Sequence, residues 1–200
     1  MAQAHAERAL RAAGHKLFSH LDPDLLGPAQ TLWLNGERLW LASTVTSRSV
    51  SSVLDEFEQR CQPLLKSRGV DSDGMGHLAC LANAPEHGSQ SLLMRARDFA
   101  QSGDLSQLGD VLYVVARPDT TSKFTHVISV WTEDKFDLAA MFSSSRDAPG
   151  ADSETVPRPP NSVRILSANV AERPYALHLY TTRESPTSVI EYYEQELKRR

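Results

Sequence analysis

The chain has 200 residues, a mass of 22.1 kDa and 40% hydrophobic residues, which suits a globular domain with a buried core. Its 21 Lys and Arg residues against 25 Asp and Glu residues give a net charge of −4 and a pI near 6.0, so the basic surface typical of nucleic-acid-binding proteins is excluded. No apolar run is long enough for a membrane-spanning helix, and we expect no membrane span.

Residues 1–30 are expected to form an N-terminal helix and a lead-in to the sheet. Between Met1 and His20, apolar residues such as Leu10, Ala13 and Leu17 recur at spacings of three and four, as on one face of a helix. Charged residues are interleaved with them, so the segment is not a secretory signal peptide. Such a beginning suits either a cytoplasmic protein or an exported protein whose signal has been removed, and the compartment is left open.

Residues 31–142 are expected to form a first strand–strand–helix unit followed by a central hairpin. Asn35-Gly36 stands between two Leu-Trp-Leu triplets, and Asn-Gly flanked by apolar residues is the strongest short hairpin signal. Ser49 is placed to cap a helix over residues 50–66. The side chains expected to pack from this helix onto the sheet are Val53, Leu54, Phe57 and Cys61.

The middle of the chain predicts further short elements. Two strands, Val111 to Ala116 and Thr125 to Trp131, flank a turn containing Pro118 and Asp119. The other expected elements are a short strand at Leu78 to Ala82, a helix at Gln90 to Gln101 that buries Leu92, Leu93, Ala96 and Phe99, and a helical turn at Asp137 to Phe142.

Residues 143–161 have the composition of a Pro- and Ser-rich linker loop, and residues 162–200 predict a second strand–strand–helix unit. Its strands are Ile165 to Val170 and Tyr175 to Thr181, and its helix, residues 186–199, begins after Ser185. The helix side chains expected to pack on the sheet are Val189, Ile190, Tyr193 and Leu197. The helix runs to Arg200 without a capping glycine, so we expect the natural chain to continue.

The two units are similar in sequence without a gap. Leu41 to Gln59 aligns with Leu177 to Gln195 at an offset of 136 residues, from 41 to 177, and seven of the nineteen pairs are identical. Either the two units are related by duplication, or they are unrelated units that obey the same local rules. The identical pairs are Leu41/Leu177, Thr46/Thr182, Ser49/Ser185, Ser52/Ser188, Val53/Val189, Glu58/Glu194 and Gln59/Gln195.

The expected fold is therefore α+β, with one structural domain overall. We predict a mainly antiparallel sheet of about six strands with helices packed on one face. The two related strand–strand–helix units would surround a central hairpin with a pseudo-twofold relation.

Two readings of the cysteines stay open, because Cys61 and Cys80 are the only two in the chain. They could form one disulfide, worth about 3 kcal/mol in the loop-entropy model and requiring an oxidising compartment, or they could be two buried thiols. A metal site of Cys61, His77 and Cys80 is the weakest reading, because zinc sites usually have paired ligands at close spacing and only His77 and Cys80 form such a pair here. We expect no metal and no cofactor.

No catalytic motif occurs in the sequence, so we predict no catalytic residues and favour a protein that is not an enzyme, without closing the question. The candidate binding residues are aromatic, because aromatic side chains with a polar group suit binding surfaces. They are Trp33, Trp40, Trp131, Tyr175 and Tyr180.

We therefore expect a non-enzymatic binding or assembly module that presents a sheet edge or an aromatic groove to a protein partner. Repeated strand–strand–helix units occur in small binding modules of bacterial envelopes, which slightly favours a periplasmic or envelope location over the cytoplasm. One alternative is a small enzyme whose site is assembled from His126, His178 and nearby carboxylates. The other is a self-associating structural subunit.

Overall fold

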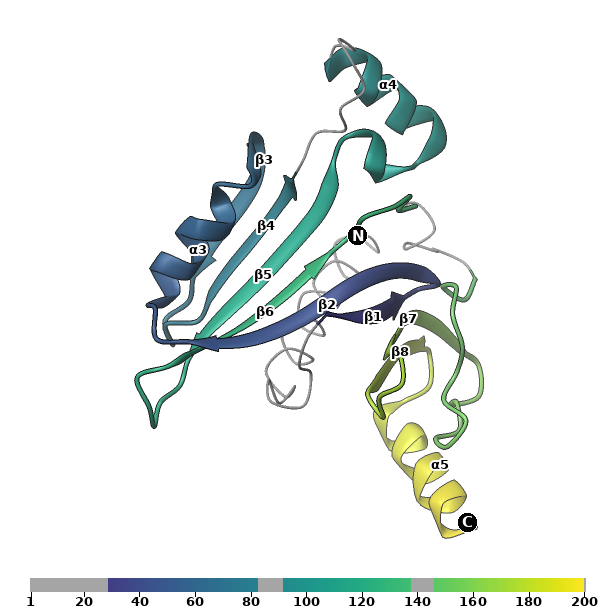
Figure 1. Cartoon of the computed structure of the whole chain (residues 1–200). Coiled ribbons are helices and arrows are strands. Elements are labelled where there is room, and N and C mark those ends of the chain that lie inside the picture. Colours follow the sequence, from purple (N-terminus) through teal and green to yellow (C-terminus); the bar gives the residue numbers. More distant parts are fainter. Residues whose placement is uncertain (1–28, 83–91, 138–145, 200) are drawn as a thin grey trace.

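The computed structural model describes residues 29–82, 92–137 and 146–199, and Figure 1 shows their arrangement. The helix expected within residues 1–20 and the helical turn expected beyond Asp137 lie outside these ranges. The strands are β1 Gln30–Leu34, β2 Glu37–Thr46, β3 Cys61–Val70, β4 Gly76–Ala82, β5 Asp110–Pro118, β6 Thr125–Trp131, β7 Ser162–Val170 and β8 Ala176–Thr182. The helices are α3 Val50–Glu58, α4 Leu92–Ser102 and α5 Pro186–Lys198, with a 3₁₀ turn at Leu105–Gln107.

The strands form one antiparallel sheet of eight, in the order β3-β4-β5-β6-β2-β1-β7-β8. The α+β class with an antiparallel sheet is confirmed. The number of strands is larger than expected, because β3 was not foreseen and β4 was foreseen only as a short addition.

The helix predicted over residues 50–66 is too long. It ends at Glu58, and residues 61–70 form β3 instead. The signal was Pro63, which has no backbone N–H and cannot continue a helix interior. Cys61, expected on the helix, is therefore the first residue of a strand. The expected cap is confirmed: the Ser49 side chain accepts a hydrogen bond from the Ser52 backbone N–H.

The turn at Asn35-Gly36 forms the expected hairpin between β1 and β2. Both residues have positive φ, 48° and 81°, as the favoured two-residue hairpin turns require. Asn35 is also buried and bonded to β7: its backbone N–H donates to the Ser167 carbonyl at 2.8 Å, and its side chain accepts from the Ser167 N–H at 2.7 Å. The turn therefore holds the first hairpin against the second.

Each face of the sheet carries a hydrophobic cluster. On one face α3 buries Val53 and Leu54 against β4, β5 and β6, whose buried residues there include Leu78 and Val114. The opposite face carries a second cluster, drawn from β1, β2, β6 and β7 with Phe136 packed onto it. Its buried members are Leu32, Leu39, Leu41, Ile128, Val130, Phe136, Ala168 and Val170.

The other two helices bury less than expected. α5 has no buried residue: Val189 and Tyr193 are half-buried, and Ile190 and Leu197 are 58% and 60% exposed, so the prediction that Ile190 and Leu197 pack on the sheet is wrong. Figure 1 shows α5 extending away from β8. On α4, Leu93 is 80% exposed. Helical periodicity identifies the apolar side of a helix, but it does not show whether that side packs on the same chain or on another molecule.

Candidate functional site

The two edges of the sheet are the first candidate sites. The outermost strand of a sheet has a row of backbone N–H and C=O groups that its own sheet leaves unpaired, and another chain can pair with that row. The outermost strands here are β3 and β8. They differ in the features by which proteins protect such an edge.

β3 carries several protective features. It contains Pro63, and its pairing with β4 shifts register between Cys61 and Lys66. Lys66 and Arg68 form ion pairs with Glu58 of α3, the latter at 2.6 Å, and the hydrogen bond from Lys66 lowers the pKa of Glu58. Proline, register irregularity and charge all discourage pairing at an edge. The β3 edge is therefore poorly suited to accept another strand.

A disulfide reinforces the same end of the sheet. Cys61 and Cys80 are bonded, with Cα atoms 5.7 Å apart, so the first residue of β3 is tied covalently to β4. The bond closes a loop of 19 residues that contains most of β3 and the turn to β4. Such a bond persists in oxidising surroundings and constrains the unfolded chain.

β8 has neither the proline nor the charge of β3, and the register shift in its pairing with β7 lies on β7, between Arg164 and Leu166. Its seven residues, Ala176–Thr182, include no charged residue and no proline. Leu177, His178, Leu179 and Tyr180 are half-buried, and no described strand pairs with the outer side of β8. An uncharged, regular edge of this kind is the sort at which proteins add a strand from a partner.

α5 follows β8 after three intervening residues and carries exposed apolar side chains. Ser185 caps it by accepting from the Ser188 N–H at 3.1 Å, and Pro186 is its first residue. Tyr192 donates to the Arg158 carbonyl at 2.9 Å, which fixes the first half of the helix to the loop before β7. Ile190 and Leu197, seven residues apart, lie along one side of the helix and are exposed.

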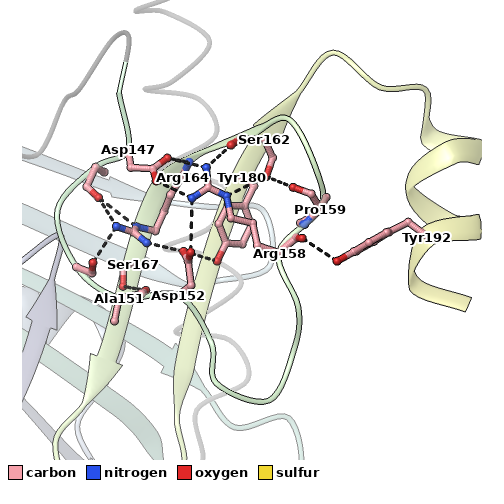
Figure 2. Close-up of polar contacts among 12 residues, drawn as sticks. Asp147, Ala151, Asp152, Arg158, Pro159, Ser162, Arg164, Ser167, Tyr180 and Tyr192 are labelled. Atoms are coloured by element: carbon pink, nitrogen blue, oxygen red, sulfur yellow. Dashed lines mark hydrogen bonds and ion pairs between the residues drawn. The ribbon is translucent and has the colours of Figure 1, made fainter. Parts of the chain in front are cut away.

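The loop at residues 146–161 supports β7 and β8 through a group of four charged side chains and one tyrosine that we call the clamp: Asp147, Asp152, Arg158, Arg164 and Tyr180 (Figure 2). Arg164 lies in β7 with only 7% of its surface exposed. Its guanidinium donates to the Ala148 carbonyl at 2.9 and 3.1 Å and to the Gly150 carbonyl at 2.8 Å, and it forms an ion pair with Asp152. The expected linker is thus bound tightly to the sheet along this stretch.

Arg158 completes the clamp from the loop side. It binds Asp147 through two hydrogen bonds of 2.6 and 2.8 Å, which lower the pKa of that carboxyl to about 2. Its guanidinium lies 5.4 Å from the ring centre of Tyr180, whose hydroxyl donates to Asp152 at 3.0 Å. Burial and that hydrogen bond raise the pKa of Tyr180 to about 12. Two arginines are balanced by two aspartates, so the clamp positions β8 rather than offering charge to a ligand.

The three candidate tryptophans share one face of the sheet. Trp40 lies opposite Trp131 in the β2–β6 pair, and Trp33 lies opposite Arg38 in the β1–β2 pair, which strand alternation places on the face that α3 covers. The Arg38 guanidinium lies 5.8 Å from the Trp40 ring centre, and the Trp131 indole N–H donates to Glu133 at 3.0 Å. Trp33 is the most open of the three, at 43% exposed.

The two candidate tyrosines do not join this group. Tyr175 packs against the hydrophobic cluster on the opposite face, and Tyr180 belongs to the clamp. The five residues therefore form no single site. The clamp itself was missed, although Arg164 gave a signal as a lone charge within an otherwise uncharged strand.

His126 and His178, the residues of the enzyme alternative, are not brought together. His126 lies in β6 and His178 in β8, and three strands separate them in the sheet. Nδ1 of each ring is buried without a hydrogen-bond partner in the described part of the chain, while Nε2 of His126 lies 3.7 Å from a carboxylate oxygen of Asp119. Nothing in this placement favours acid–base catalysis by the pair.

Across residues 29–82, 92–137 and 146–199 there is no cluster of three or more His, Cys, Asp or Glu side chains that could hold a metal ion. Within the same ranges no helix has both the length and the apolar character needed to cross a membrane. The site and fold together define an α+β protein with a protected sheet edge at β3 and, at β8, an edge with which no strand of the described ranges pairs. Comparison with known proteins finds no matching family model, curated protein or solved structure.

Proposed function

We propose that the protein is a non-enzymatic binding module that takes up a protein partner at the open edge of β8 and the adjoining exposed side of α5. The contrast between the two sheet edges carries the proposal. β3 has proline, charge and a register shift within the strand itself, while β8 has no proline and no charged residue, and the register shift in its pairing with β7 lies on β7, between Arg164 and Leu166. β8 is followed by a helix that buries no residue.

The shape of the surface fits a protein better than a small molecule. A strand edge offers a row of main-chain donors and acceptors, and the exposed Ile190 and Leu197 add apolar contacts a few residues further along the chain. The donors and acceptors of a strand edge repeat along the strand, as pairing with an extended polypeptide requires. The clamp holds Tyr180 and the underlying strand β7 in place, so the edge is presented in a fixed conformation.

We place this module in an oxidising compartment, such as a periplasm or cell envelope. The support is the Cys61–Cys80 bond, because disulfides are rare where cellular thiols keep cysteines reduced. Two-fold relatedness of the strand–strand–helix units is part of the same proposal and is developed below.

Site-specific photo-crosslinking in cells that naturally express the protein tests the proposal. A photoreactive residue is placed at Leu177 or Ile190, with Val70 of β3 as the control at the protected edge. We expect a protein adduct from the β8 and α5 positions and none from Val70. No adduct at any position, or adducts only at Val70, would refute the proposal, and an adduct with the mass of two chains would replace it by self-association.

A further inference from the structure

The two hairpins meet in a way that relates them to each other. In the order β2-β1-β7-β8 they join through their inner strands, where Leu32 lies opposite Val170, Trp33 opposite Asn169 and Leu34 opposite Ala168. Adding the 136-residue sequence offset to residues 32, 33 and 34 of β1 gives residues 168, 169 and 170 of β7. Leu32 therefore pairs with the counterpart of Leu34, and Leu34 pairs with the counterpart of Leu32. This is the pairing pattern of a twofold contact centred on Trp33 and Asn169.

The helix caps follow the same offset. Ser49 accepts from the Ser52 N–H at 3.3 Å, and Ser185, 136 positions later, accepts from the Ser188 N–H at 3.1 Å. The β1–β7 register and the two helix caps therefore follow the same 136-residue offset as the sequence alignment.

Under this relation the counterpart of β8 is β2, and the edge of β2 that faces away from β1 is paired with β6. β6 pairs with β2 along residues 40–46, and adding the offset gives 176–182, which are the bounds of β8. On β2 this stretch carries an antiparallel strand, whereas on β8 none of the described strands occupies the equivalent edge.

The two hairpins differ in the register of their paired strands. In the first hairpin Gln30 lies opposite Leu41, and the 136-residue offset turns this pair into Leu166 opposite Leu177. The second hairpin has a longer turn, and Leu166 lies opposite Leu179 instead. The shift is two residues from Leu166 to Asn169 and one residue from Ser162 to Arg164, because the extra residue of the irregularity lies on β7. β8 itself is continuous through residues 176–182, so its side chains keep the alternation of residues 40–46.

We infer that the partner enters as an extended strand that pairs antiparallel with Ala176–Thr182 in the manner of β6 on β2, and this rests on the function proposed above. The partner segment would be about seven residues long, with apolar side chains at alternate positions beside Leu177 and Leu179. β6 shows the pattern, because Val130 and Ile128 lie opposite Leu41 and Ser43.

β6 also indicates a preference at the start of the strand. The Thr125 hydroxyl donates to the Arg48 carbonyl at 2.7 Å, next to the helix cap. The equivalent residue beside the second cap is Glu184, whose position follows from the same offset. We expect a partner strand that begins with Ser or Thr to donate in the same way.

The probe for this inference is a synthetic peptide with the sequence of residues 123–133, KFTHVISVWTE, added to the intact isotope-labelled protein. Amide NMR shifts and hydrogen exchange locate its binding. We expect changes along Ala176–Thr182 and none along β3. A peptide with Ser129→Pro loses a ladder hydrogen bond on the side that faces β2 in the protein, and it should bind at least about tenfold more weakly.

Matched protein variants test the location. Leu179→Lys should weaken peptide binding at least about tenfold, because charge on an edge strand opposes pairing, and Ser67→Lys on β3 should leave it unchanged. If Leu179→Lys does not fold, Thr181→Lys, at an exposed position of the same strand, takes its place.

Three results would overturn the inference: no binding at about 1 mM peptide, changes confined to other strands, including β2, or β8 amides already protected in a dimer of the free protein. A negative peptide result together with adducts from β8 in cells would leave the binding function standing and remove only strand addition. The reverse combination would show an edge that accepts strands but no partner in the cell.

Discussion

Replacing Arg164 by methionine tests whether the clamp holds the loop at residues 146–161 to the sheet. Methionine retains much of the apolar stem and removes the guanidinium. The Ala148 and Gly150 carbonyls lose their charged donor, and Asp152 loses an ion-pair partner. Hydrogen bonds to charged groups are worth about 1.5 to 3 kcal/mol, and breaking a buried ion pair costs about 3 to 5 kcal/mol.

The expected loss of unfolding free energy lies at the lower end of these two ranges. The Asp152 side chain is 38% exposed and keeps its bond from Tyr180, so its isolation costs little. We expect Arg164→Met to lower the free energy of unfolding by about 3 kcal/mol, equivalent to roughly 6 to 12 °C in Tm for a chain of this size. Chemical and thermal denaturation measure both quantities.

The matched control is Arg199→Met, which removes an exposed ion pair with Glu196 at 2.8 Å. An exposed pair of this kind contributes at most about 0.5 kcal/mol. A loss for Arg164→Met of less than about 1 kcal/mol, or one no larger than that of the control, would refute the reasoning that the clamp stabilises this part of the fold.

Three further predictions concern the disulfide, a tyrosine and a helix. Replacing Cys61 and Cys80 together by alanine should lower the free energy of unfolding by about 3 kcal/mol in denaturation experiments; an unchanged value would contradict the bridge. Tyr180 should ionise near pH 12 rather than 10 by ultraviolet absorbance, and because its folded pKa is raised, the stability it contributes is present below pH 10 and is lost as the pH rises from 10 towards 12. Tyr180→Phe should remove that late step, and its persistence would assign it to another tyrosine. Leu54→Ala should cost about 3 kcal/mol because Leu54 is fully buried, whereas Ile190→Ala, at 58% exposed, should change stability by no more than about 0.5 kcal/mol; equal losses would show that α5 packs on the sheet.

Local chemistry was enough to predict several elements. The Asn35-Gly36 hairpin and the Ser49 and Ser185 caps depend on interactions within a few residues, and each is found in the structure. The strands β5 and β6 are also found near their expected positions, because continuous β-branched runs bounded by turn residues are typical of buried strands. The sheet class followed from these elements.

Other features depend on contacts between distant residues. In the sequence Asp147 and Asp152 belong to a stretch with the composition of a solvated linker, whereas in the structure both contact Arg164 of β7. The apolar stripe of α5 looked like a core face, since composition cannot tell a surface buried by the same chain from one left for a partner. The openness of β8 likewise depends on strand order, which the sequence does not state.

β3 is the clearest error, and its cause was visible. The helix predicted over residues 50–66 contains Pro63, and proline ends helices at or before the preceding residue. Pro63 is therefore the sequence signal for a shorter helix, with Cys61 at the start of a strand and not on a helix face.

The central claim is that β8 is the edge at which a partner binds. The most direct measurement is amide hydrogen exchange by mass spectrometry, comparing the protein purified alone with the same protein in a native cell extract. The account predicts new protection within residues 176–182 in the extract and unchanged exchange within residues 61–70. Protection that appears at β3 alone, or at neither edge, would contradict it.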